Sequence, residues 1–312
     1  MNLASKRILV TGATGFVGVN LVRRLLESHN KLHILLRPNS NNLWRLRGLS
    51  IKNVHELNLL DKKRLMRKIS QIKPQIIFHL AAYGSYPGEK DFQRILDINV
   101  VSTINLYKAC SEAGFEVFVN TGSSSEYGIV DKPMREDMPL APLTSYGSTK
   151  AAATIILAQL AKDNQCTVTL RPFSVYGPFE QRSRLIATLM VGAVLGKEVA
   201  LASKKSAHDF VFVEDLIDAY LLAAVKRIPG IFNIGTGSEY SNWEVLQIAK
   251  RILEGKLSGH WGKQAPRPQE VKHWICDNRR AKKMLGWKPK HNLEQGLLET
   301  YKWFGKNINY YL

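Results

Sequence analysis

The sequence predicts an α/β fold built on a doubly wound parallel sheet. Short apolar runs alternate with helical patterns through the first half of the 312-residue chain, and this alternation is typical of a parallel sheet covered on both faces. Turns rich in glycine, alanine and serine follow several of the apolar runs, at the strand ends where such sheets bind ligands. The length suits one large domain or two domains that pack closely together.

The first apolar run leads into the clearest ligand-binding motif of the chain. Residues 8–10 predict a buried strand, and apolar residues at helical spacing predict a helix that begins near Phe16. Gly12 would allow a tight turn, Gly15 would let the backbone approach a ligand, and Gly18 would let the helix pack on the strand. The helix N-terminus would offer N–H groups to a pyrophosphate. The alternative is a glycine turn in an ordinary strand–helix unit.

The other elements are expected along the whole chain. Further strands are predicted at 31–36, 53–57, 75–80, 117–120 and 167–170, with a returning strand and turn at 232–237. Helices are predicted at 99–113, 151–160, 185–195 and 216–225. Residues 171–178 form a turn-rich excursion, and the chain from 242 is expected to be helical except for a basic, proline-containing loop at 262–272.

Several strand ends should line one cleft, because parallel strands end at the same edge of their sheet. The segments that follow these strand ends are the glycine turn, Arg37, residues 81–84 and residues 123–125. Arg37 lies about 20 residues past the last glycine, where an acidic side chain would bind the ribose hydroxyls of NAD. A guanidinium there suits a 2′-phosphate instead. The alternative is an exposed loop arginine.

Tyr146 and Lys150 form a candidate acid–base pair. They are four residues apart at the start of a helical run, so both side chains project from one face. The Lys150 ammonium would stabilise a phenolate and lower the pKa of Tyr146 toward working pH. Tyr146 could then act as a general acid or base. The alternative is an incidental surface pair.

Composition excludes several classes of protein. The net charge of +18 comes from basic residues that are spread widely, with modest clusters at 62–68, 204–205 and 279–283, so a solvated basic surface is favoured over nucleic-acid binding. No apolar run is long enough to span a membrane, and no signal-type stretch precedes the first strand. Cys110, Cys166 and Cys276 lack metal-ligand spacing, so we expect no metal and a reduced, cytoplasmic protein.

Taken together, these motifs are similar to those of the extended short-chain dehydrogenase/reductase family, in its nucleotide-sugar epimerase/dehydratase branch. The similar segments follow in order along nearly the whole chain: 11–18, 79–82, Asn99, 123–127, Tyr146 with Lys150, 171–178, 209–215 and 285–289. The resemblance implies a Rossmann domain at 1–170, joined again by about 209–236. It also implies a smaller mixed substrate-binding domain at 171–208 and 237–312, and a homodimer formed through helices 99–113 and 150–163.

The resemblance also implies a role for individual residues. Tyr146 would be the acid/base, Lys150 would hold the nicotinamide ribose, and Ser123 would hydrogen-bond the reacting sugar oxygen. The cofactor, NADP with NAD as the alternative, would contact Tyr146, Lys150 and the residues Gly12, Thr14, Gly15, Phe16, Val17, Gly18, Arg37, Asn58, Leu59, Leu80, Ala81, Ala82, Asn99 and Phe173. The nucleotide-diphosphate sugar would contact Ser85, Ser124, Ser125, Ser174, Arg182 and Arg267.

The sequence also departs from the family's pattern. Sugar 4,6-dehydratases of this family follow their catalytic threonine with two polar residues, the second a glutamate needed for elimination, and this chain has Ser124 and Ser125 there. The enzyme that makes GDP-fucose has a reactive cysteine where Ser125 stands. Ser174, His208 and Asn58 stand where many members have asparagine, arginine and aspartate respectively.

These features predict an NAD(P)-dependent oxidoreductase that acts at C4 of a nucleotide-linked sugar, as a 4-keto-sugar reductase or 4-dehydrogenase. The alternative is a 4-epimerase whose cofactor is reduced transiently. No elimination of water is expected, because Glu126, the nearest carboxylate, would point away from Ser125 if this segment is extended. A rival of another class is a non-catalytic cofactor-binding regulator, but such relatives typically lose the tyrosine or the lysine, and this chain keeps both.

Overall fold

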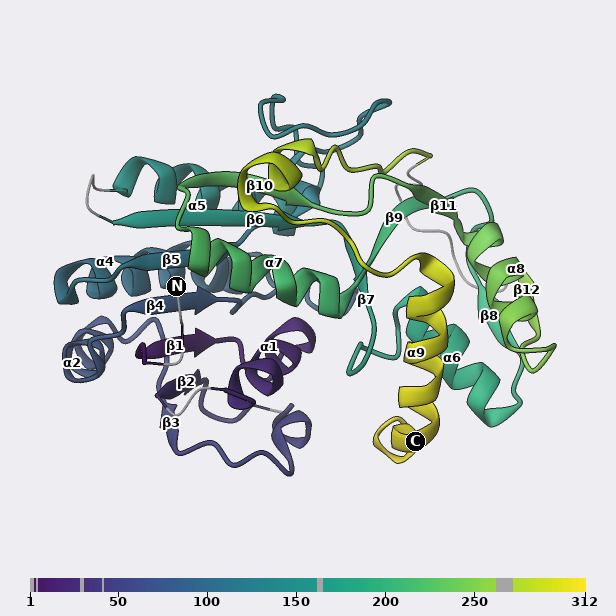
Figure 1. Cartoon of the computed structure of the whole chain (residues 1–312), viewed down its shortest axis with the longest axis horizontal. Helices are drawn as coiled ribbons and strands as arrows, with labels where there is room; N and C mark the ends of the chain where they lie inside the picture. Colours follow the sequence, from purple (N-terminus) through teal and green to yellow (C-terminus); the bar gives the residue numbers. More distant parts are fainter. Residues whose placement is uncertain (1–2, 4, 29–30, 41, 162–164, 262–271) are drawn as a thin grey trace.

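A parallel sheet of seven strands forms the centre of the protein (Figure 1). The computed structural model describes every residue except 1–2, 4, 29–30, 41, 162–164 and 262–271. The strand order is β10-β6-β5-β4-β1-β2-β3, so the order along the chain reverses beside β1 (Ile8–Thr11), which pairs with both β2 and β4. The other strands are β2 (Leu32–Leu36), β3 (Asn53–Glu56), β4 (Ile76–His79), β5 (Val117–Thr121), β6 (Cys166–Pro172) and β10 (Gly230–Ile234).

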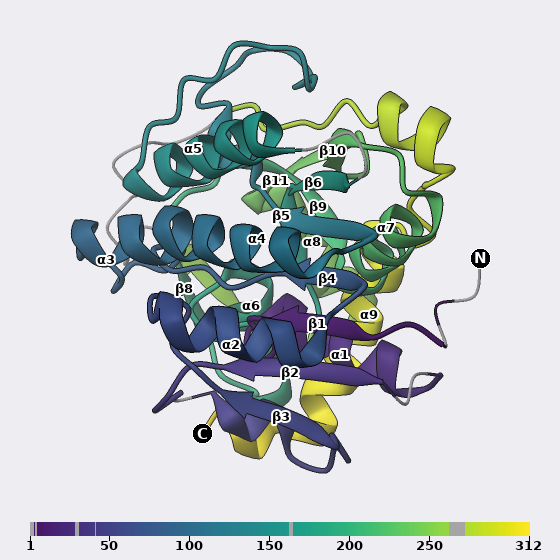
Figure 2. The same ribbon diagram turned by 90° about the vertical axis from the view of Figure 1, so that its left-hand side faces the viewer.

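Helices cover both faces of this sheet, as predicted. On one face lie α1 (Phe16–Leu26) and α7 (Val213–Lys226), and on the other lie α2 (Lys62–Ile72), α4 (Ser102–Ala113) and α5 (Ser145–Leu160) (Figures 1 and 2). Alternate residues of β1 enter separate cores, because successive strand side chains point to opposite faces. Ile8 and Val10 join the core under α1 and α7, whereas Leu9 joins the core under α2, α4 and α5.

The second half of the chain adds a smaller mixed layer. β7 (Ser174–Tyr176), β9 (Ala207–Phe212) and β11 (Glu239–Ser241) form a three-stranded sheet, and β8 (Val199–Leu201) pairs with β12 (Gly259–Trp261). Helices α6 (Leu185–Leu195), α8 (Asn242–Ile252) and α9 (Leu293–Asn307) share a separate core with these strands. The expected turn-rich excursion at 171–178 therefore contains a strand, and the region after 242 is less helical than predicted.

Short elements complete the chain. They are α3 (Phe92–Leu96), the π-helical turns η2 (Asp97–Val101) and η4 (Ala281–Leu285), and the 3-10 turns η1 (Leu43–Leu46), η3 (Ser124–Glu126) and η5 (Ile308–Tyr310). Two of them, η1 and η3, position the side chains discussed below.

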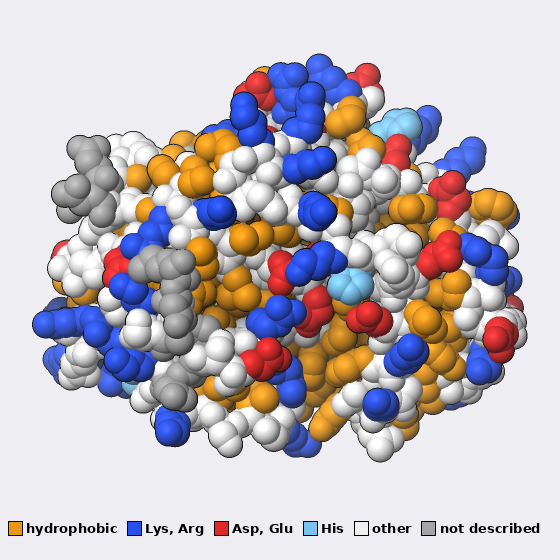
Figure 3. All heavy atoms as spheres, viewed as in Figure 1, with side chains coloured by type: hydrophobic (Ala, Val, Ile, Leu, Met, Phe, Trp, Pro, Cys, Tyr) orange, Lys and Arg blue, Asp and Glu red, His pale blue; other side chains and the backbone are white. Residues whose placement is uncertain are grey.

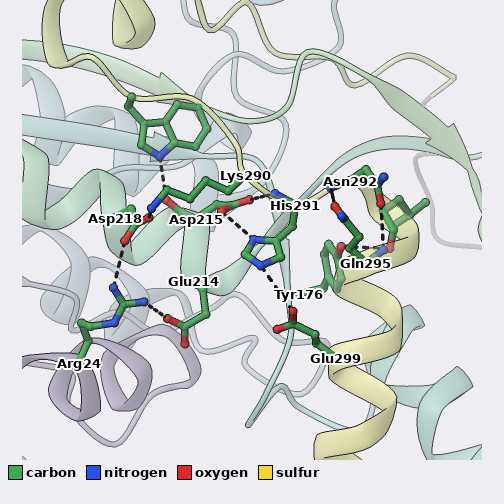
Figure 4. A network of polar contacts seen from close by, with 12 residues as sticks. Arg24, Tyr176, Glu214, Asp215, Asp218, Lys290, His291, Asn292, Gln295 and Glu299 are labelled. Atoms are coloured by element: carbon green, nitrogen blue, oxygen red, sulfur yellow. Dashed lines mark hydrogen bonds and ion pairs between the residues drawn. The ribbon is translucent and has the colours of Figure 1, made fainter. Parts of the chain in front are cut away.

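A polar network fastens the segment before α9 to α1 and α7 (Figure 4). Arg24 of α1 forms ion pairs with Glu214 at 2.5 Å and with Asp218 at 3.2 Å. The ring of His291 lies 2.9 Å from a carboxylate oxygen of Asp215, and the backbone N–H of His291 donates to the other oxygen at 3.0 Å. Hydrogen bonds at the N-terminus of α7 thus join the core under α1 and α7 to the core that contains α9.

The surface carries its basic charge in a scattered way. Figure 3 shows Lys and Arg side chains distributed over one face among acidic and apolar ones. Within the part of the chain that the structure describes, no helix has the length and apolarity needed to cross a bilayer.

Candidate active site

The glycine turn after β1 lies against the end of β4. Gly12 has a φ of +72°, and a Cβ there would lie 2.5 Å from the carbonyl carbon of Leu80 and 2.6 Å from the nitrogen of Ala81. α1 begins at Phe16 as predicted, with Gly15 as its N-cap, and no described side chain caps it. The backbone N–H groups at the start of α1 are therefore open to an anion.

The other predicted cofactor residues lie along the same sheet edge, and they differ in exposure and in hydrogen-bond partners. Arg37 follows β2 and is exposed, whereas Phe173, which follows β6, is buried. Asn58 follows β3, and its side-chain oxygen accepts the N–H of Leu60 at 3.0 Å. Asn99 is fully buried and bonds the backbone N–H and C=O of Tyr83 at 2.9 and 2.8 Å. Asn99 therefore fixes the loop after β4, and its cofactor contact stays a prediction.

Ser123, Tyr146 and Lys150 come together beyond the end of β5. The N-cap Thr144 accepts the N–H of Gly147 at 3.0 Å and starts α5, whose first turns carry both Tyr146 and Lys150. The Ser123 side chain faces the Tyr146 phenol closely enough to favour its ionised form. Lys150 is only 2% exposed, so the pair is not an incidental surface feature.

The electrostatics of this pair differ from the sequence-based prediction. Burial raises the pKa of Tyr146 to about 12, although the Ser123 side chain works in the opposite direction. Burial also lowers the pKa of Lys150 to about 8, against the nearby charge of Glu126, which raises it. The expected lowering of the Tyr146 pKa by Lys150 is thus wrong for the cofactor-free protein: burial dominates, and the opposing contributions come from Ser123 and Arg184.

A buried ion pair holds Ser123 in place. Glu126 is fully buried in η3, and one of its carboxylate oxygens accepts the backbone N–H of Ser123 at 2.8 Å and the hydroxyl of Thr154 at 3.1 Å. The other oxygen accepts the Nε–H of Arg171 at 2.8 Å. Arg171 also donates to the phenol oxygen of Tyr127 at 2.8 Å. The segment is therefore not extended, the condition on which Glu126 would point away from Ser125: it is a 3-10 turn whose carboxylate folds back onto Ser123.

The predicted substrate residues differ in burial and in hydrogen-bond partners. Ser124 is buried and accepts the indole N–H of Trp274 at 2.9 Å, whereas Ser125 and Ser174 are half-buried and Ser85 is exposed. Arg182 is exposed, and its guanidinium donates to the carbonyl of Tyr311 at 2.7 Å, near the C-terminus. Arg267 lies outside the described residues.

Residues 8–235 match the model of the NAD dependent epimerase/dehydratase family. The chain belongs to this family. A UDP-glucose 4-epimerase of Mycolicibacterium smegmatis is 31% identical over 311 residues, which cover 96% of this chain and 98% of that protein. The predicted α/β fold, the family resemblance and the prediction of an enzyme are confirmed.

Solved structures of family members align over nearly the whole chain. UDP-glucose 4-epimerase of Thermotoga maritima, crystallised with UDP-glucose, has a TM-score of 0.86 at 28% identity and covers 96% of this chain and 99% of its own. MoeE5, in complex with UDP-glucuronic acid and NAD, has a TM-score of 0.82 at 31% identity with the same coverage of both chains. The nicotinamide dinucleotide of this family fits the glycine turn, because the uncapped N-terminus of α1 leaves backbone N–H groups open to its pyrophosphate.

Sequence reasoning missed four residues near Tyr146 and the glycine turn: Arg45, Tyr86, Glu180 and Arg184. The charge of Arg184 acts on Tyr146 and on Tyr86, lowering the pKa of both against the effect of burial. Glu180 is buried, and a carboxylate oxygen lies 4.0 Å from Arg184 Nε. No local pattern marks these residues, because the tertiary fold brings them together from η1 and two loops. Among the described residues, no cluster of His, Cys, Asp or Glu could hold a metal ion.

Proposed function

We propose that the protein transfers a hydride at C4 of a nucleoside-diphosphate sugar and thereby inverts that carbon. The observation that carries this proposal is the Ser123 side chain facing Tyr146, which lies one helical turn before the buried Lys150, together with a glycine turn whose uncapped helix suits a dinucleotide. Epimerisation is favoured over the other predicted reactions because the family members compared above include UDP-glucose 4-epimerases.

Each of the three side chains has a distinct role in this proposal. The Ser123 hydroxyl donates a hydrogen bond to the C4 oxygen and polarises it. The Tyr146 phenol exchanges a proton with that oxygen, and the Lys150 ammonium stabilises the phenolate that forms. The bound cofactor supplies a hydride acceptor and donor. Glycine-turn N–H groups bind its pyrophosphate, and Lys150 orients its ribose.

In the described segment that follows Ser123, no acidic side chain is free to serve an elimination of water. Dehydration of a sugar needs a free acid for the leaving hydroxyl and a base for the adjacent carbon. Ser124 is bound to Trp274, and the Glu126 carboxylate is occupied by Ser123, Thr154 and Arg171. We therefore infer that the chemistry ends with hydride and proton transfer.

A second candidate is reduction of a 4-keto sugar by NADPH. The exposed guanidinium of Arg37 at the end of β2 favours this candidate, because it could bind a 2′-phosphate. Calorimetric titration with NAD(H) and NADP(H) tests this preference. Tighter binding of NADP(H) is expected, and equal or tighter binding of NAD(H) would remove the support for it.

A substrate panel tests the function. We would offer CDP-, dTDP-, GDP- and UDP-hexoses together with their 4-keto-6-deoxy forms, and follow both nicotinamide absorbance and product mass. Epimerisation gives a product of unchanged mass without net use of cofactor, whereas reduction consumes one NAD(P)H per turnover. A product lighter than its hexose by one water would contradict the proposal, and binding without any turnover would favour the regulator.

A further inference from the structure

Arg45 is a buried cation beside the glycine turn. It lies in η1, which follows β2, and is only 3% exposed. One guanidinium nitrogen donates to the carbonyl oxygen of Thr14 at 3.0 Å, and Thr14 stands between Gly12 and Gly15 in the turn. The guanidinium thus lies next to the backbone that would receive a dinucleotide.

The charge of Arg45 has no carboxylate to balance it in the described part of the chain. None of the ion pairs formed there includes Arg45, and its Nε–H has no hydrogen-bond partner among the same residues. Its guanidinium carbon lies 5.1 Å from the centroid of the Trp44 ring, its other electrostatic neighbours are the phenols of Tyr86 and Tyr311, and burial lowers its pKa. An unpaired charge is costly to bury, so this arrangement suits an anion that arrives from outside the chain.

Aromatic packing holds the turn that carries Arg45. The ring of Trp44 stacks on Tyr310 with centroids 4.9 Å apart and meets the edge of Tyr311 at 5.8 Å. The hydroxyl of Tyr311 in turn donates to the backbone carbonyl of Glu180 at 2.9 Å. The C-terminal residues therefore fix Arg45 against the glycine turn before any ligand binds, which reduces the entropy lost on binding.

We propose that Arg45 binds the diphosphate of the dinucleotide cofactor and supplies the cation that the glycine turn lacks. The N–H groups of the turn offer partial charges only, whereas a guanidinium forms charge-assisted hydrogen bonds to phosphate oxygens. Arg37 has a separate role in this account, because it is exposed and follows β2 directly. The inference rests on the proposed function only in that it requires a nicotinamide dinucleotide.

Binding measurements on the cofactor-free protein test this assignment. Arg45→Met should raise the Kd of ADP-ribose and of NADP⁺ roughly 10- to 100-fold, because a charge-assisted bond to the diphosphate is lost. The Kd of UDP should not change, and the melting temperature should stay the same or rise, because an unbalanced buried charge is removed. Arg47→Met, an exposed neighbour in the same segment, is the control for net charge.

Four outcomes would overturn the inference. An unchanged Kd with a lower melting temperature would show a purely structural residue. A loss confined to UDP would assign Arg45 to the sugar nucleotide, and a loss seen with NADP⁺ but not with ADP-ribose would assign it to the 2′-phosphate. If the wild type binds neither ADP-ribose nor NADP⁺, the proposed function fails and the inference fails with it. Should Arg45→Met not fold, Arg45→Lys is the alternative variant. It keeps the charge but loses the paired N–H donors of the guanidinium, and it should show a smaller rise in both Kd values.

Discussion

Tyr146 and Lys150 are both mainly protonated near neutral pH. The pKa of Tyr146 is raised to about 12 by burial, and that of Lys150 is lowered to about 8, so the phenol is protonated and the amine is still largely charged. This state suits donation of a proton to a sugar oxygen. Formation of the phenolate then depends on the nearby ammonium and on Ser123.

Replacing Tyr146 with phenylalanine should remove the proton transfer and little else. We expect turnover to fall by roughly 100-fold or more, since a general acid or base contributes about that factor. The melting temperature and the cofactor Kd should stay near those of the wild type, because the ring is kept. Steady-state kinetics on the substrate found in the panel measures the effect. Near wild-type turnover would contradict the proposed acid–base role of Tyr146.

Glu180 makes stability depend on pH. Burial raises its pKa from 4.5 to about 8, against the lowering effect of Arg184. Between these values the folded protein keeps a proton that the unfolded chain has lost, so this carboxyl makes folding less favourable as the pH rises from about 4.5 to 8.

Glu180→Gln should therefore stabilise the cofactor-free protein more at pH 8 than at pH 5. Denaturant unfolding at the two pH values measures the difference in unfolding free energy between variant and wild type. Glu112→Gln, at an exposed position, is the matched control and should show no such pH dependence. An equal effect of Glu180→Gln at both pH values would contradict the account.

At the scale of elements, the pair of Glu126 and Arg171 joins η3 to β6. The exposed fractions of both side chains are 2% or less, so removing one partner leaves an uncompensated buried charge. Glu126→Leu and Arg171→Met should each lower the unfolding free energy by about 3–5 kcal/mol. The double variant should lose much less than the sum, because both charges are gone.

A double-mutant cycle of unfolding free energies tests this coupling. Turnover should fall in the Glu126→Leu variant and in the double variant, because the backbone N–H of Ser123 loses its acceptor there. It should fall less in Arg171→Met, which keeps that acceptor, and the cofactor Kd should change little in all three variants. Thr300→Val, a buried position in α9 far along the chain, provides a comparison for loss of a single buried hydrogen bond. Additive losses of stability would show that the two charges do not depend on each other.

Local patterns allowed prediction of those elements whose signal lies within a few residues. The glycine turn, the start of α1 at Phe16 and the four-residue spacing of Tyr146 and Lys150 are of this kind. The three-residue strands β8, β11 and β12 were missed, because their partners lie more than 25 residues away in the chain. The basic run at 62–68 was interpreted only as charge, although Leu65 and Ile69 form the buried side of α2.

The candidate site was predictable to a similar extent. Ser123, Tyr146 and Lys150 carry recognisable motifs; Ser123 acts on Tyr146, and Glu126, which binds the N–H of Ser123, acts on Lys150. The 3-10 turn that buries Glu126 could not be foreseen, because its stability depends on Arg171, which is 45 residues away. Arg45 was missed for the same reason: its burial is created by the C-terminal aromatic residues.

At the scale of the whole molecule, the hydrophobic cores fall into two groups, and the predicted domain bounds stay a prediction. The cores on the two faces of the seven-stranded sheet are separate from the core shared by α6, α8 and α9. α7 and β10 lie with the large sheet, whereas β9 pairs with β7 and β11. We propose that the cofactor binds to the group that contains the seven-stranded sheet and the sugar nucleotide between the two groups.

The predicted homodimer has a candidate surface on α4 and α5, which lie side by side on the outer face of the sheet (Figure 2). Ile155 of α5 is 59% exposed and Val101, just before α4, is 39% exposed. We expect the wild type to be a dimer in light scattering and Ile155→Asp to be a monomer, because a charge would be buried in the interface. Leu298→Asp, at an exposed position on α9, should remain a dimer. A monomeric wild type, or a dimeric Ile155→Asp variant, would contradict the predicted interface.

Tracing the hydrogen at C4 of the sugar tests the central claim most directly. The protein would be incubated with UDP-glucose that carries deuterium at C4, and with other nucleotide hexoses labelled in the same way, and the products would be analysed by NMR and mass spectrometry. The account predicts a product of unchanged mass in which C4 is inverted and still carries deuterium. A product that has lost water, with the deuterium moved from C4 to C6, would contradict it.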